Sequence, residues 1–182
     1  MHQVFEVDHP ATQQWKQARL RDLNIEPPPN LTFIPLDFEK RPLPEGLQAG
    51  GYRPEAPAFF SWLGVTMYLT EDAIFQTLRA VASSAPGSEI VFDYPLLDSL
   101  LDEENRRFLA ALKAFGAEQG EPWVSLFEPA GLAARVKALG FTQVLDFSPE
   151  EAFTRYFTDR PDGLRPLQVA HLIMKARAGD IP

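Results

Sequence analysis

The sequence predicts an α/β fold built on a mostly parallel β-sheet. Strand-like and helix-like segments alternate along its 182 residues, the pattern expected when each helix returns the chain to the next parallel strand. The continuous apolar run at 58–63 is typical of a central parallel strand that is buried on both faces. Because no repeat or change of composition divides this pattern, we expect a single domain over residues 1–182.

Six short segments rich in apolar residues are predicted as strands. They cover residues 3–7, 31–35, 58–63, 89–94, 141–147 and 168–176. A sheet of this kind binds ligands at the carboxyl ends of its strands, so polar residues that follow the strands are the first candidates for a site.

Helix start and stop signals lie between these strands. Pro10 suits the first position of a helix that runs to about residue 22, with Asp8 expected as its N-cap. Thr70 can cap a helix that extends through residue 82. Gly140 suits the end of a further helix, and Ser148 begins a capping-box sequence that leads into a helix to residue 157.

Two other segments are expected between the strands. Residues 39–57 contain four prolines and three glycines, so we expect mainly loop with one helical turn. Residues 96–118 are predicted as a helical insertion whose buried stripe consists of Phe108, Leu112 and Phe115.

Composition restricts the classes of function. The net charge is −8 and no basic stripe is visible, so no nucleic-acid partner is expected. The absence of cysteine excludes disulfides and thiolate catalysis and fits a cytoplasmic protein. No signal peptide and no apolar stretch of membrane-spanning length is visible, and three scattered histidines predict no metal site. The sequence contains neither a nucleophile-elbow motif nor a phosphate-binding P-loop.

Three motifs carry a family resemblance: EVDHP at 6–10, FFSWLGVTMYLT at 59–70 and RYFTDRPDGLR at 155–165. They resemble the bacterial branch of the leucine carboxyl methyltransferase-like family of S-adenosylmethionine-dependent O-methyltransferases, and the resemblance runs through essentially the whole chain. It implies a three-layer, Rossmann-like class I methyltransferase sheet with strand order 3-2-1-4-5-7-6 and an antiparallel last strand. On that template the chain is N-terminally truncated: it carries strands 2 to 7 and lacks the first strand and the glycine-rich loop.

The resemblance also implies residues that bind S-adenosylmethionine. Glu6 would accept hydrogen bonds from the ribose hydroxyls, a role that carboxylates at strand ends commonly have. Asp37 would meet the adenine amino group and Phe38 would line the ring, while Leu63 and Gly64 would border the cofactor at the end of the third strand. Many relatives have glutamate where this chain has Leu63. Each assignment has an alternative. Glu6 could be only a carboxylate favoured by a nearby helix, Asp37 could form an ordinary Asx turn after its strand, and Leu63 and Gly64 could serve packing alone.

The same resemblance suggests residues for the methyl acceptor. Tyr68, next to Met67, would border the acceptor pocket or else belong to the core. Tyr156, Arg160 and Arg165 would bind the acceptor, since paired arginines suit a carboxylate. A solvated turn braced by an Arg–Asp162 pair explains the same residues equally well. The insertion at 96–119 is the expected lid.

The function predicted from these residues is methyl transfer to a small carboxylate or hydroxyl acceptor. No catalytic residue is predicted, because a carboxylate acceptor is already nucleophilic and needs no general base. The alternative is a non-catalytic α/β remnant or a partner-binding subunit that uses an open sheet edge. A second copy or an N-terminal partner could fill the missing strand position, but for the isolated chain we expect residues 4–7 to pair directly with 58–63.

Overall fold

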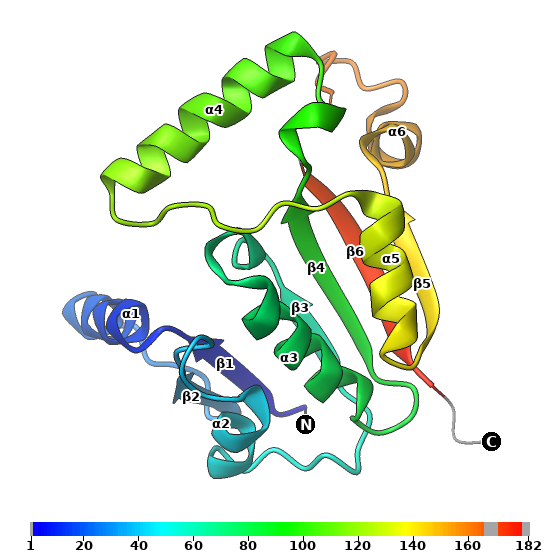
Figure 1. Cartoon of the computed structure of the whole chain (residues 1–182). Helices are drawn as coiled ribbons and strands as arrows, with labels where there is room; N and C mark the ends of the chain where they lie inside the picture. Colours follow the sequence, from blue (N-terminus) through cyan, green and yellow to red (C-terminus); the bar gives the residue numbers. More distant parts are fainter. Residues whose placement is uncertain (1, 166–170, 180–182) are drawn as a thin grey trace. The chain divides into compact units, whose positions relative to one another are not determined.

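The computed structural model describes residues 2–165 and 171–179, and the chain divides into two compact units, Met1–Ala56 and Pro57–Pro182. Each unit has its own sheet and is described by itself (Figure 1). The expectation of one domain concerns how the units join, and it stays a prediction.

The first unit is a two-stranded parallel sheet with two helices. Its elements in chain order are β1 (Val4–Asp8), α1 (Pro10–Asp22), β2 (Leu31–Pro35) and α2 (Leu43–Ala49). The pairing of Val4 with Leu31 sets the register, so both strands end at the same edge of the sheet. The two predicted strands and the first predicted helix are therefore confirmed.

The start of α1 differs from the prediction. His9, not Asp8, is the N-cap, and its imidazole Nδ1 accepts the Ala11 N–H at 3.4 Å. Asp8 instead accepts the N–H of His9 itself at 2.7 Å. Further along the helix, the buried Gln13 side chain donates to the Glu6 carbonyl at 3.0 Å and so ties α1 to β1.

Helix α2 is longer than the single turn expected for this proline-rich segment. Proline is tolerated in a first helical turn, where its missing N–H costs no hydrogen bond. The helix then packs closely on β2: a Cβ at Gly46 would lie 2.8 Å from Leu36 Cδ1 and 3.1 Å from Ile34 Cγ2. Packing against the core residues Ile34 and Leu36 explains a helix that local composition did not predict.

The second unit contains a four-stranded sheet in the order β3-β4-β6-β5. Its elements in chain order are β3 (Phe59–Trp62), η1 (Thr66–Tyr68), α3 (Glu71–Ala82), β4 (Glu89–Pro95), η2 (Asp98–Leu100), α4 (Glu103–Glu118), α5 (Pro129–Ala138), β5 (Phe141–Phe147), α6 (Pro149–Ala152), the π-helical turn η3 (Phe153–Phe157) and β6 (His171–Ala178). Strand β6 is antiparallel to both neighbours, which confirms the expected antiparallel last strand. The part of the predicted last strand at 168–170 lies outside the described residues.

One expectation for β3 is wrong. The strand pairs in parallel with β4 but occupies the edge of its own sheet, and Phe59 is 64% exposed, so it is not a central strand buried on both faces. The direct pairing of residues 4–7 with 58–63 would join the two units, and it stays a prediction.

The core of the second unit lies between the sheet and the helices drawn in front of it in Figure 1, α3 and α5. Alternate β4 residues Ile90, Phe92 and Tyr94 are buried, as period-two geometry requires. Three predicted helix signals are confirmed here. Thr70 caps α3 through the Ala73 N–H, Gly140 follows α5 with a φ of +103°, and Ser148 forms a complete capping box with Glu151.

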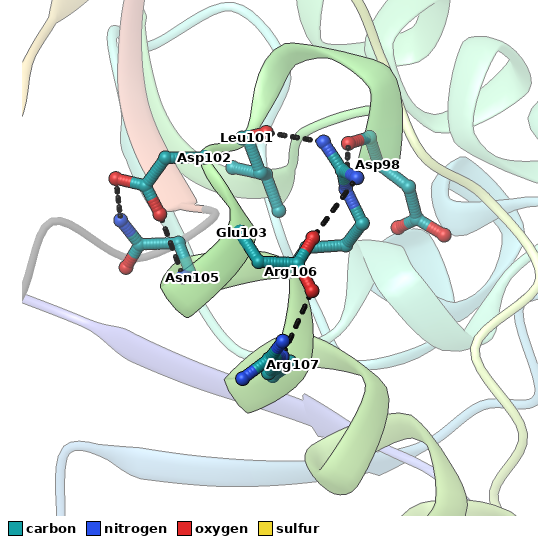
Figure 2. Close-up of polar contacts among 7 residues, drawn as sticks. All are labelled: Asp98, Leu101, Asp102, Glu103, Asn105, Arg106 and Arg107. Atoms are coloured by element: carbon teal, nitrogen blue, oxygen red, sulfur yellow. Dashed lines mark hydrogen bonds and ion pairs between the residues drawn. The ribbon is translucent and has the colours of Figure 1, made fainter.

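Helix α4 begins in a dense polar network (Figure 2). Asp102 caps it through the Asn105 N–H at 2.8 Å, and the Arg106 guanidinium donates back to the Leu101 carbonyl at 2.8 Å. Glu103 pairs with Arg107 at 2.8 Å. These contacts fix the orientation of the first two turns.

The buried stripe of α4 is not the predicted one. Leu109 is the buried residue and forms a small core with Leu101. Phe108 and Phe115 are 45% and 64% exposed. The apolar side chains of α4 thus span a wider arc of the helix than the part that packs against the core.

Candidate functional site

Glu6 lies near the carboxyl end of β1, and its two carboxylate oxygens differ. Oε2 forms an ion pair of 2.6 Å with Lys16 on α1. Oε1 is buried and has no hydrogen-bond partner among the described residues. A buried acceptor without a donor is costly, and a donor that reached this oxygen would offset that cost.

Asp37 follows β2 and is held by its neighbours in sequence. One oxygen accepts the Glu39 N–H at 3.0 Å and the other accepts Lys40 Nζ at 2.7 Å. The Lys40 hydrogen bond is the main reason that the pKa of Asp37 lies below its usual range. These contacts form the Asx turn that was the alternative to a binding role for Asp37. A carboxylate in such a turn can still accept further hydrogen bonds. Phe38 beside it is half-buried.

The carboxyl ends of β1 and β2 lie side by side in the first unit. Leu36 donates its N–H to the Asp8 carbonyl at 2.8 Å, which holds the two strand ends together. His9 Nε2, just after β1, lies 3.7 Å from an oxygen of Asp37, just after β2. Glu6 lies two residues before the end of β1, and its role with Asp37 at the nucleoside end of the cofactor stays a prediction.

Gly64 follows β3 in the left-handed region, with a φ of +71° and no atom within 4 Å of where a Cβ would stand. Its N–H donates to Asp93 Oδ1 at 2.8 Å. Leu63 is 52% exposed, so packing alone does not account for it. The backbone at Gly64 is open to close approach by a ligand.

Tyr68 and Met67 have different surroundings. Met67 is buried, as the core alternative expects, whereas Tyr68 is partly exposed and packs edge-on against Trp123 with ring centroids 6.5 Å apart. Val124 donates its N–H to the Met67 carbonyl at 2.7 Å, which fastens the segment after α4 to η1.

The predicted acceptor residues of the tail form a braced turn. Arg160 donates twice to Asp162, at 2.9 and 2.5 Å, which forms the Arg–Asp162 brace and leaves other N–H groups of the guanidinium for a ligand. Arg165 lies 5.2 Å from the Phe153 ring centroid, and Tyr156 packs on Phe147 at 6.1 Å.

Three contacts near the strand ends were not predicted: the Lys16 pair with Glu6, the Asp93 bond to Gly64, and a hydrogen bond of 2.8 Å from the Tyr94 hydroxyl to Asp146. Asp93 carries the same signal as Glu6, a carboxylate at the end of a predicted strand. The other two depend on packing between elements.

The described residues form neither a metal site nor a membrane-spanning helix. No group of three or more His, Cys, Asp or Glu side chains there could hold a metal ion. None of the helices in that part of the chain has the length and apolar character needed to cross a membrane.

The fold has known counterparts among solved structures. The methyltransferase SibL superposes on 98% of this chain and 44% of its own, with a TM-score of 0.55 and 13% identity. Human N-acetylserotonin methyltransferase, solved with S-adenosylmethionine, gives a TM-score of 0.56 and 16% identity over 98% of this chain and 41% of its own. The class I methyltransferase fold expected from the sequence is confirmed.

Sequence comparison shows which proteins the chain is similar to. Residues 1–82 match the family model described as leucine carboxyl methyltransferase. The Bacillus subtilis (strain 168) protein named "Putative S-adenosyl-L-methionine-dependent methyltransferase YktD" is 33% identical over 172 residues, which cover 94% of this chain and 56% of the relative. The chain is thus similar to leucine carboxyl methyltransferase-like proteins, and it spans about half the length of the curated relatives it matches.

Proposed function

We propose that this chain binds S-adenosylmethionine and belongs to an O-methyltransferase of small carboxylate or hydroxyl acceptors. The observation that carries the proposal is the buried, unpartnered Oε1 of Glu6, two residues before the carboxyl end of β1, in a segment that matches the family model. The open space at Gly64 also fits a bound cofactor. Asp37 and Phe38 would contact the adenine, and Leu63 would lie along the cofactor.

When bound, S-adenosylmethionine supplies an activated methyl group. The tasks left to the protein are to orient the acceptor oxygen in line with the methyl–sulfur bond and to exclude water. We assign orientation of the acceptor to Tyr68, Tyr156, Arg160 and Arg165. The α4 insertion would form a wall of the acceptor pocket. The hydrogen bonds around Arg106 hold the start of α4 in place.

Calorimetric titration of the chain with S-adenosylmethionine tests the proposal. We expect micromolar binding, and we expect Glu6→Gln to weaken it about tenfold or more, because ribose hydroxyls donate more strongly to a carboxylate than to an amide. The matched control is Glu26→Gln, an exposed carboxylate in the loop after α1. An absence of heat at millimolar cofactor would reject the proposal.

A second candidate is a non-catalytic subunit that binds a partner through an open sheet edge. It is favoured by the one-sided pairing of β1 and β3, each of which leaves backbone groups available to another strand. We propose that such a strand comes from a second copy, from an N-terminal partner or from a longer form of the chain. Binding of an added polypeptide that carries a strand, by a chain that takes up no S-adenosylmethionine, would support this candidate.

A further inference from the structure

Asp93 is a carboxylate that touches the loop after β3. It lies at the carboxyl end of β4, the parallel neighbour of β3. Its Oδ1 accepts the Gly64 N–H at 2.8 Å, and its main-chain carbonyl accepts the hydroxyl of the fully buried Thr66 at 2.6 Å. Two bonds from one residue thus fix the loop at both of its ends.

The second carboxylate oxygen of Asp93 takes no part in either of these two hydrogen bonds. Among the side chains that the structure describes, no basic group pairs with Asp93, although the residue is half-buried. Charged groups that are partly removed from water are usually paired. An unpaired carboxylate at the carboxyl ends of parallel strands lies where such sheets bind their ligands.

The loop offers no other charge to a ligand. Leu63 is exposed beside Gly64 but is apolar, and Gly64 contributes only backbone. S-adenosylmethionine carries positive charge at its sulfonium and at its ammonium group. We propose that Asp93 binds the cationic end of the cofactor with its free oxygen while its other oxygen holds Gly64 in place.

This inference rests on the proposed function, and three ligands test it. S-adenosylmethionine has both cationic groups, S-adenosylhomocysteine has only the ammonium, and 5′-methylthioadenosine has neither. The variant Asp93→Asn removes the charge but keeps an oxygen that can accept from Gly64. The matched control is Asp72→Asn, the same loss of charge in the first turn of α3.

We expect Asp93→Asn to bind S-adenosylmethionine about ten- to a hundredfold more weakly than the wild type, because bonds to charged groups are the strong ones. Its affinity for 5′-methylthioadenosine should stay within about twofold of the wild type. Weakening of S-adenosylhomocysteine to the same extent assigns the ammonium group to Asp93, and unchanged affinity for it assigns the sulfonium. Asp72→Asn should bind all three ligands as the wild type does.

Two results would overturn the role assigned to Asp93 but leave the proposed function standing. One is wild-type affinity of Asp93→Asn for S-adenosylmethionine. The other is equal weakening of all three ligands, which would mean that the loop is only misplaced. A wild-type chain that takes up none of the ligands would instead overturn the proposed function, and the role of Asp93 with it.

Discussion

The Tyr94 hydroxyl on β4 and the Asp146 carboxylate on β5 join the two strands that flank β6 by a partly buried hydrogen bond of 2.8 Å. Burial raises the pKa of Asp146, the Tyr94 bond opposes this shift, and the charge of Glu151 adds to it. Burial also raises the pKa of Tyr94, so its hydroxyl remains a donor at neutral pH. A carboxyl group whose pKa is higher in the folded state binds more protons there than in the unfolded chain.

The free energy of unfolding should therefore fall as the pH rises from below the ordinary pKa of aspartate through the raised value of Asp146. Asp146→Asn lacks this titration and can still accept from Tyr94. We expect its stability relative to the wild type to increase over that pH range, as measured by urea unfolding at successive pH values.

The variant Tyr94→Phe gives the complementary result, because it removes the donor that lowers the pKa of Asp146. The pH dependence should then extend to higher pH than in the wild type. A stability difference between Asp146→Asn and the wild type that does not change with pH would contradict this account.

The buried hydroxyl of Thr66 gives a second prediction at the scale of a single residue. Thr66→Val keeps the shape of the side chain but leaves the Asp93 carbonyl without its donor. We expect a loss of about 1–3 kcal/mol in the free energy of unfolding. Thr142→Val, at an exposed position of β5, should change it by less than about 0.5 kcal/mol. Equal effects of the two variants in urea unfolding would be evidence against the buried bond.

At the scale of the element, α4 is attached by a narrow part of its apolar surface. Leu109 is buried against Leu101, with Leu96, Trp123 and Leu126 around them. A Cβ at Gly116 would lie 3.6 Å from the Trp123 indole nitrogen, so the helix packs closely on the segment that follows it.

This packing predicts unequal effects along the helix. Leu109→Ala should lower the free energy of unfolding by about 2–5 kcal/mol, the usual range for a buried leucine. Phe115→Ala removes a larger but exposed side chain, and we expect a change within about 0.5 kcal/mol. Thermal unfolding of both variants provides the measurement. A larger loss of stability for Phe115→Ala than for Leu109→Ala would instead support the buried stripe predicted from the sequence.

At the scale of the whole molecule, the two sheets differ in how much each is supported. Strand β4 has a hydrogen-bonded neighbour on each side, whereas within the described part of the first unit β1 and β2 pair with each other alone. A two-stranded sheet is marginal unless helices pack on it, and here α1 and α2 supply the cover.

Amide hydrogen exchange should reveal this difference. We expect β4 amides to exchange most slowly and β1 and β2 amides at least about tenfold faster, because local opening requires less free energy where fewer contacts are lost. Mass spectrometry of peptides from the two units is the measurement. Equal protection of β1 and β4 would show that the first unit is stabilised as strongly as the second.

The sequence predicted where the strands that carry Glu6 and Asp37 run, while the binding role of these residues stays a prediction. Glu6 lies within β1 and Asp37 follows β2, and the two strands end at one edge because parallel strands in register must. The Lys16 pair with Glu6 was not predictable, since it depends on how α1 rotates as Gln13 packs on β1. Asp93 could have been found from its position, but its bond to Gly64 depends on the turn after β3.

The sequence by itself determined the order of elements, the class of fold and the helix caps at Thr70 and Ser148, because these depend on local propensity and hydrophobic period. Only the tertiary structure decided that β3 is an edge strand, that Leu109 rather than Phe115 is buried, and that α2 is a true helix. Periodicity identifies an apolar face, but which part of that face is covered depends on neighbours distant in the sequence.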